Sequence, residues 1–156
     1  MPEIGNTLEY ADLKRILPQA YPFLMLDRVV DYKKNEYLTA VKNITVNEWP
    51  VTGCNENIST FPEVLLIEAA AQAALVFCNI DKTEQESQSV QYYIGRTKAE
   101  FFSSVFIGDQ IRISILTGKI MNQSGYVSGC VFVEEQKIAE IDLFLSILRK
   151  NEAKNA

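Results

Sequence analysis

Two polar side chains interrupt the most apolar stretch of the sequence, and their spacing suits acid–base chemistry. Glu68 and Gln72 lie four residues apart within residues 64–77, and every other residue of that stretch is apolar. Two residues at this spacing project from one face of a helix. Apolar surroundings disfavour the charged form of a carboxylate, which suits Glu68 to donate a proton as a general acid. The alternative is a buried polar anchor that hydrogen-bonds to loop backbone, with Gln72 orienting Glu68 or the loop.

The sequence offers few partners for such an acid. It contains no histidine, the usual general base near pH 7, so every histidine-dependent dyad or triad within one chain is excluded. Cys54 could approach Glu68 within the chain or across a dimer, but no basic neighbour activates its thiol, and a bystander thiol is the favoured interpretation. Cys78 and Cys130 lie in apolar stretches and are expected in the core. A zinc site and a disulfide framework are not expected, because the cysteines are widely spaced.

Composition limits the class of protein. A chain of 156 residues with 47% hydrophobic and 22% charged residues is typical of one globular domain. The net charge of -5 disfavours nucleic-acid binding, and the scattered glycines form no phosphate loop. No apolar run reaches the ~20 residues of a membrane span, and the N-terminus lacks a secretory signal, so the cytoplasm is the expected location.

The elements that must position Glu68 follow from the apolar pattern. A capping box at Thr60 and Glu63 predicts the start of a helix over 64–77, which is expected to be buried all round. One buried helix and several long strands predict an α+β fold in which an antiparallel sheet wraps the helix. We expect one domain over 1–148 and a polar C-terminal tail over 149–156. The pattern also predicts a short helix over 10–17, an irregular segment over 47–60, and strands over 27–32, 37–46, 91–94, 110–121, 126–134 and 137–147.

Several motifs occur in the order found in a known family: Leu17–Arg28, Ala40–Asn43, Val46–Glu48, Phe61–Gln72, Tyr93–Gly95 and Phe106–Gln110. They span roughly residues 8 to 148 and resemble the FabZ-type β-hydroxyacyl-acyl-carrier-protein dehydratases. The resemblance implies a hotdog fold, in which an antiparallel sheet wraps a long central helix and two chains pair to form one continuous sheet. It also implies an acyl tunnel at the dimer interface.

The resemblance further implies how the family removes water from a 3-hydroxyacyl thioester. A histidine of one chain takes the α-proton, and a glutamate of the other chain helps the hydroxyl to leave. A backbone amide at the start of the central helix polarises the thioester carbonyl, which is a known use of free donors at a helix terminus. Glu68 matches the family's glutamate.

The departures from the family fall on this chemistry. Cys54 occupies the position of the catalytic histidine, and Gln19 replaces the histidine of the opening motif. Glu63 stands where the family has a glycine, and it adds bulk and negative charge near the expected carbonyl site. A thiol is a poor replacement base, and the loss of a positioned base costs about 10²–10⁴-fold in rate. A homodimer of this chain is therefore expected to be a poor dehydratase.

The resemblance implies an acyl-thioester-binding, dehydratase-like protein of fatty acid or polyketide biosynthesis, a member of a lyase family, with a degenerate catalytic dyad. A histidine-bearing paralogue in a heterodimer would restore one complete site by pairing its histidine with Glu68. Two alternatives stay open. One is a hotdog thioesterase for acyl-CoA or acyl-carrier protein in which Glu68 is base or nucleophile, and the other is a non-catalytic structural or acyl-binding partner subunit.

The expected partners are an acyl carrier protein or CoA thioesters and a second chain, in a homodimer, a heterodimer or a higher oligomer. No cofactor is implied, because the substrate is carried on phosphopantetheine, and no metal ligands are expected. The expected catalytic residues are Glu68 and, at the histidine position, Cys54. The expected substrate-binding residues are Phe61, Glu63, Val64, Gln72, Tyr93 and Gly95. The candidates for docking an acidic carrier protein are Arg28, Arg96 and Lys98. Ordinary solvent-exposed charges on a strand would explain these three residues equally well.

Overall fold

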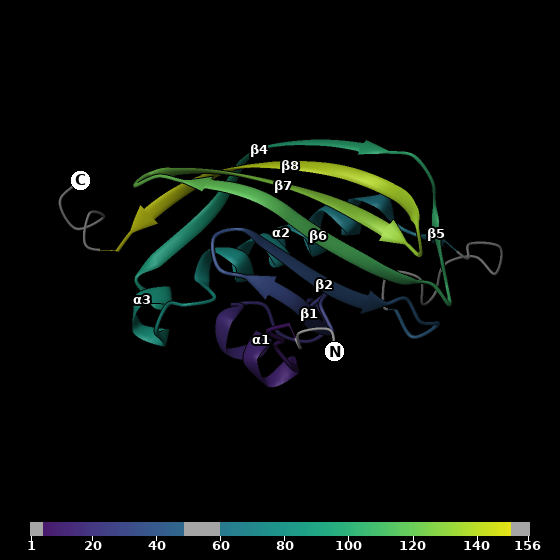
Figure 1. The fold of residues 1–156 in the computed structure, drawn as a ribbon, viewed down its shortest axis with the longest axis horizontal. Helices are drawn as coiled ribbons and strands as arrows, with labels where there is room; N and C mark the ends of the chain where they lie inside the picture. Colours follow the sequence, from purple (N-terminus) through teal and green to yellow (C-terminus); the bar gives the residue numbers. More distant parts are fainter. Residues whose placement is uncertain (1–4, 49–59, 151–156) are drawn as a thin grey trace.

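The computed structural model describes residues 5–48 and 60–150, which form a six-stranded antiparallel sheet around one long helix (Figure 1). The helices are α1 (Tyr10–Ile16), α2 (Glu63–Asn79) and α3 (Glu84–Gln88). None of these helices is long and apolar enough to cross a membrane. The strands are β1 (Arg28–Lys33), β2 (Tyr37–Asn43), β3 (Thr60–Phe61), β4 (Val90–Phe101), β5 (Val105–Phe106), β6 (Gln110–Ile120), β7 (Ser124–Val133) and β8 (Gln136–Arg149).

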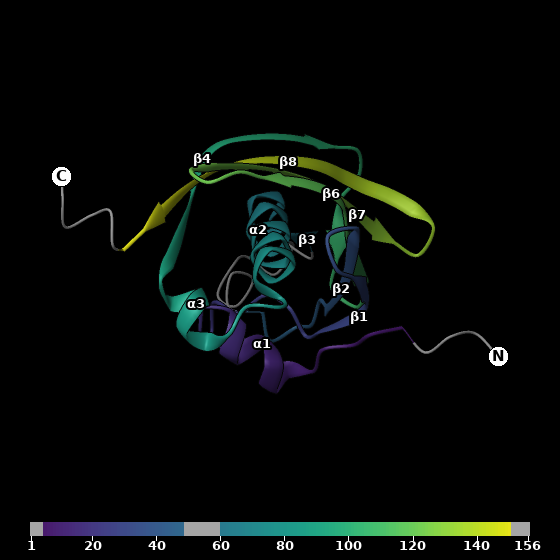
Figure 2. The ribbon, with the colours of Figure 1, turned by 60° about the vertical axis from the view of Figure 1, so that its left-hand side comes forward.

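The large sheet has the strand order β1-β2-β6-β7-β8-β4, and every neighbouring pair is antiparallel. Strands β6, β7 and β8 form an antiparallel meander, while β1 and β4 are the two edge strands. Viewed nearly along its axis, α2 lies in the hollow of the curved sheet, and α1 and α3 lie on the other side of α2 (Figure 2). The predicted α+β architecture, with a sheet wrapped around a central helix, is therefore confirmed.

Small side chains on α2 bring the sheet close to the helix. Ala69 and Ala73 are 0% exposed, and so is Leu66 from the same helix. Full burial of a leucine side chain contributes about 2 kcal/mol, so the helix and the concave face of the sheet form one core. Leu66 packs in that core with the concave-face residues Ile113, Val131, Ile141 and Leu143.

The prediction that α2 is buried all round is wrong at its N-terminal end. Val64 is 68% exposed, and Leu65 and Ile67 are only half-buried. The sheet and the short helices cover the remaining sides of α2, but nothing in the described part of the chain covers Val64.

Three local predictions differ from the structure. Thr60 and Glu63 do not form a capping box: the N-cap of α2 is Pro62, and Thr60 instead pairs with Phe106 in the small β3–β5 sheet. Strand β2 ends at Asn43 rather than at residue 46. Helix α3 has no counterpart among the predicted elements, although Thr83 caps it in a capping box with a glutamate three residues later.

Candidate functional site

Glu68 and Gln72 form the centre of the candidate site. Both lie on α2, and Nε2 of Gln72 donates a hydrogen bond of 2.8 Å to Oε1 of Glu68. The prediction that these side chains share one face of a helix is confirmed. Glu68 itself is half-buried in the single chain. The bond uses one carboxyl oxygen and fixes the orientation of the group.

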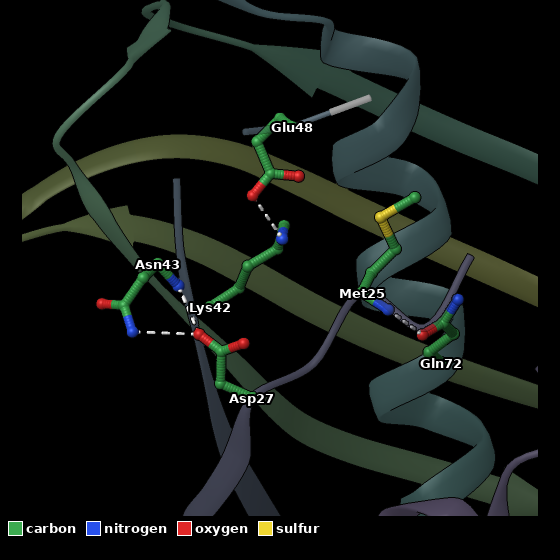
Figure 3. Close-up of polar contacts among 6 residues, drawn as sticks. All are labelled: Met25, Asp27, Lys42, Asn43, Glu48 and Gln72. Atoms are coloured by element: carbon green, nitrogen blue, oxygen red, sulfur yellow. Dashed lines mark hydrogen bonds and ion pairs between the residues drawn. The ribbon is translucent and has the colours of Figure 1, made fainter. Parts of the chain in front are cut away.

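Gln72 is in turn fixed by the segment that precedes β1. Its side chain is 0% exposed, and its Oε1 accepts from the backbone N–H of Met25 at 2.7 Å (Figure 3). Its Nε2 also donates to the carbonyl of Phe23 (2.8 Å). The prediction that Gln72 orients Glu68 or a loop is thus met on both counts. Because Gln72 is enclosed, its role in the chain is to position Glu68 rather than to present a surface to substrate.

The start of α2 lies beside this pair. Glu63 is the first residue of the helix and is exposed. Val64 is four residues before Glu68, so Val64 and Glu68 project from the same face of the helix. Phe61, in contrast, is 0% exposed and pairs with Val105 across the β3–β5 ladder. Its ring belongs to the core and is not a surface that a substrate could reach in this chain.

Neither position where the family carries a histidine provides a base in the described structure. Cys54 falls within 49–59, outside the described residues. Gln19 follows α1, and its Oε1 is buried without a hydrogen-bond partner among the residues described. A buried acceptor without a partner costs about 1–3 kcal/mol, so Gln19 is not optimised for the fold of the single chain.

The predicted residues on β4 are separated from Glu68. Tyr93, Arg96 and Lys98 pair with Ser146, Phe144 and Asp142 of β8, whose side chains alternate with the buried ones, so all three lie on the outer face of the sheet. The Arg96 guanidinium lies 5.6 Å from the ring centroid of Phe144. Tyr93 also borders a cavity of about 630 Å³ formed by α1, the C-terminal end of α2, α3 and β4.

The three predicted docking cations do not form a single patch. Arg28 begins β1, whereas Arg96 and Lys98 belong to β4, at the opposite edge of the sheet. Gly95 lies in β4 next to a register shift between Ile94 and Arg96 and is exposed. Arg96 and Lys98 therefore remain the only adjacent pair among the predicted cations.

Strand β4 also leaves apolar side chains uncovered on the inner face of the sheet. Ile94 and Phe101 pair with the buried residues Leu145 and Ala139, so they share the face that packs against α2. Even so, they are 46% and 37% exposed. Together they form a half-open apolar surface on β4, which has a free edge in the large sheet.

The cysteines in the described part of the chain are structural. Burial raises the pKa of the Cys78 thiol to about 11, and burial also raises the pKa of Cys130. A raised pKa leaves little thiolate near neutral pH, which makes these thiols poor nucleophiles. The described residues also contain no cluster of three or more side chains suited to hold a metal ion.

Comparisons with known proteins agree with this geometry. The FabA-like domain matches residues 17–142. A 3-hydroxyacyl-[acyl-carrier-protein] dehydratase FabZ of Koribacter versatilis is 32% identical over 150 residues, which cover 95% of this chain and 94% of that protein. The FabZ dehydratase of Legionella pneumophila (strain Lens) is 36% identical over 113 residues, which cover 72% of this chain and 75% of that protein.

A solved structure supports the same fold. A chain of the dehydratase heterocomplex ApeI:P from Xenorhabdus doucetiae has a TM-score of 0.76 at 15% sequence identity, and the alignment covers 92% of this chain and 95% of that chain. At this identity the likeness concerns the fold alone. Together with the family match over residues 17–142 and the dehydratase relatives, it shows that the chain has the hotdog fold and belongs to the FabA-like family, as a relative of the FabZ 3-hydroxyacyl-acyl-carrier-protein dehydratases.

Proposed function

We propose that this chain is a dehydratase-type subunit that supplies the carboxyl half of a shared active site and takes the base from a histidine-bearing partner chain. The observation that carries the proposal is the fixed Glu68 carboxyl group, held at 2.8 Å by a fully buried Gln72, in a chain without any histidine. A carboxyl group oriented in this way suits acid chemistry. The missing base must come from elsewhere.

The proposed reaction is the removal of water from a 3-hydroxyacyl thioester. The partner's histidine takes the proton from the α-carbon, and the carbon–oxygen bond at the β-carbon breaks as the double bond forms. Glu68 gives a proton to the departing hydroxide, so that water leaves. The products are a 2-enoyl thioester, water, a protonated histidine and a Glu68 carboxylate, and proton exchange with solvent restores the dyad. This chemistry uses no metal or organic cofactor.

The half-open apolar surface supports a shared site. Ile94 and Phe101 are 46% and 37% exposed on β4, an edge strand of the sheet, and Val64 at the start of α2 is 68% exposed. Pairing of a second chain along β4 would continue the sheet and cover this surface, in the way the family forms dimers. The substrate would arrive on phosphopantetheine of a carrier protein or on CoA, and Arg96 with Lys98 on β4 are the proposed contacts for an acidic carrier.

The test is a mixed complex in which only one kind of site can work. The chain is co-expressed with a FabZ-type paralogue from the same genome whose own catalytic glutamate is replaced by glutamine. Paralogue homodimers then lack the acid, homodimers of this chain lack histidine, and only a site that joins the paralogue's histidine to Glu68 is complete. We expect a stable mixed complex that forms enoyl product from a 3-hydroxyacyl carrier protein.

Two variants assign the activity. Glu68→Gln should abolish product formation by the mixed complex, while Glu135→Gln, an exposed carboxyl group in the turn between β7 and β8, should leave it unchanged. The proposal fails if no mixed complex forms, or if the complex is inactive with Glu68 present. Release of free acid by the unmixed chain, lost in Glu68→Gln, would instead establish a thioesterase.

A further inference from the structure

A buried ion pair lies outside the Glu68–Gln72 pair. Nζ of Lys42, on β2, is 2.9 Å from Oε1 of Glu48, and the two side chains are only 8% and 12% exposed (Figure 3). The other ion pairs in the described part of the chain are much more exposed, with side-chain exposures of 32% or more. Charged side chains are rarely buried to this degree, and the cost of removing both charges from water offsets much of their attraction, so the pair is weak evidence for a gain in stability.

The same ammonium group also contacts the other end of the intervening segment. Nζ of Lys42 lies 5.9 Å from the ring centroid of Phe61, within the range of a cation–π interaction. Glu48 immediately precedes residues 49–59, and Phe61 follows them and leads directly into α2. One side chain therefore bridges the two stems that flank residues 49–59.

Hydrogen bonds hold the end of β2, where Lys42 lies, firmly in place. Its neighbour Asn43 donates to Oδ2 of Asp27 through both its backbone N–H (2.7 Å) and its side-chain amide (3.0 Å), and its Oδ1 accepts from Gln110 (2.8 Å). The next residue, Ile44, donates from its backbone N–H to the carbonyl of Asp109 (2.8 Å). The end of β2 is thus held from two sides, and it can serve as a rigid reference for the stems.

We propose that Lys42 is a positioning residue that holds both stems at a fixed separation and so sets the start of α2, from which Glu68 projects. The inference rests on the proposed function for its catalytic consequence. Lys42 and Glu48 would act through geometry and would not touch substrate. A displacement of about 1 Å at a reacting group can cost up to ~100-fold in rate, so a loss of this clamp should be measurable.

The two charges must be removed together to separate positioning from folding. Removal of one member takes the ion pair away from a charge that stays buried and destabilises the fold, whereas replacement of both by apolar residues of similar length is often neutral for stability. The test variant is therefore Lys42→Met with Glu48→Met. The matched control replaces the exposed pair Lys33–Glu36 (2.8 Å, side chains 62% and 55% exposed) by Lys33→Gln with Glu36→Gln. The single variant Lys42→Arg keeps the positive charge and should therefore retain the wild-type position of the start of α2.

Three readouts are compared for each variant. Thermal unfolding reports global stability, hydrogen exchange of the peptide 60–66 in the chain alone reports the start of α2, and kcat and KM of the mixed complex report catalysis. For the double Met variant we expect a melting temperature near that of the wild type, exchange in 60–66 about tenfold faster, and kcat about tenfold lower with little change in KM. Exchange over 70–79 should not change.

The inference is overturned if the double Met variant keeps wild-type exchange over 60–66 and a wild-type kcat. It is also overturned if exchange rises equally over 60–66 and 70–79, which would indicate a general structural role. If the wild-type mixed complex is inactive, the proposed function fails, but the exchange data in the chain alone still decide whether Lys42 holds the start of α2.

Discussion

The substitution Gln72→Leu tests whether one buried amide holds the candidate site together. Leucine fills a similar volume without any hydrogen-bonding group. The change removes the bond to the Glu68 carboxyl group (2.8 Å), the bond to the Phe23 carbonyl (2.8 Å) and the acceptor of the Met25 N–H (2.7 Å). All three involve a side chain that is 0% exposed, so water does not reach Gln72 to compensate.

The magnitude follows from these contacts. A neutral hydrogen bond contributes about 0.5–1.5 kcal/mol, and a buried donor left without an acceptor costs about 1–3 kcal/mol. The bond to Glu68 is discounted, because that side chain is half-buried and can be solvated in part. The expected loss in the free energy of unfolding is therefore about 3 kcal/mol, which corresponds to a fall of roughly 6–12 °C in Tm for a domain of this size.

The assay is urea unfolding at a fixed protomer concentration, because association contributes to the measured stability. Gln85→Leu on α3 is the control: it makes the same chemical change at an exposed position and should alter stability by at most about 0.5 kcal/mol. A loss below about 1 kcal/mol for Gln72→Leu would refute the argument. In that case Glu68 would not be held by the segment that precedes β1.

Other predictions concern the buried charges, the cysteine and the free edge. Lys42→Met should lower the free energy of unfolding in urea by about 3–5 kcal/mol, whereas the double variant that adds Glu48→Met should lower it far less. Equal losses in the two variants would contradict the presence of a buried ion pair between Lys42 and Glu48. Because burial raises the pKa of Cys78 to about 11, the peptide that contains it should be alkylated at pH 8 about 100-fold more slowly than an ordinary thiol, as measured by mass spectrometry. This raised pKa stabilises the fold below about pH 9, and the contribution, up to about 3 kcal/mol, is lost as the pH rises through about 11; Cys78→Ala should abolish that part of the pH dependence, and an unchanged profile would count against it. Ile94→Asp should prevent association along β4 in light scattering, whereas Leu116→Asp, 52% exposed on β6, should leave it intact; association of the Ile94 variant at wild-type strength would place the interface elsewhere.

The apolar pattern predicts the central helix and strands β6, β7 and β8 well, because a buried helix and long β-branched strands carry local signals. It predicts only 91–94 of strand β4, which spans Val90–Phe101. The start of α2 is less accessible to such reasoning. Thr60 has the local signature of a cap, but it pairs with Phe106, which is distant in sequence. Here the pairing of two strands that are distant in sequence overrides the local preference for a helix cap. Helix α3 shows the reverse: its capping box at Thr83 is a local signal that was available in the sequence.

The candidate site also combines local contacts, which the sequence predicts, with long-range contacts, which it does not. The i and i+4 spacing predicts that Glu68 and Gln72 meet, because the helix alone fixes that contact. The bond from the Met25 N–H to Gln72 joins residues 47 apart in sequence, and the Lys42–Phe61 contact depends on where β2 lies against β3. Motif order suggests that these segments belong to one site, but only the fold gives their distances. The position of Arg96 and Lys98 on the outer face likewise depends on the register between β4 and β8.

The most direct measurement is the initial rate of enoyl product formation by the mixed complex with the glutamate-deficient paralogue, compared between wild type and Glu68→Gln. If Glu68 is the acid of a shared site, the substitution should lower the rate by about 10²–10⁴-fold, with the complex still intact. Equal rates for the two complexes would contradict the account, because the carboxyl group held by Gln72 would then have no part in the chemistry.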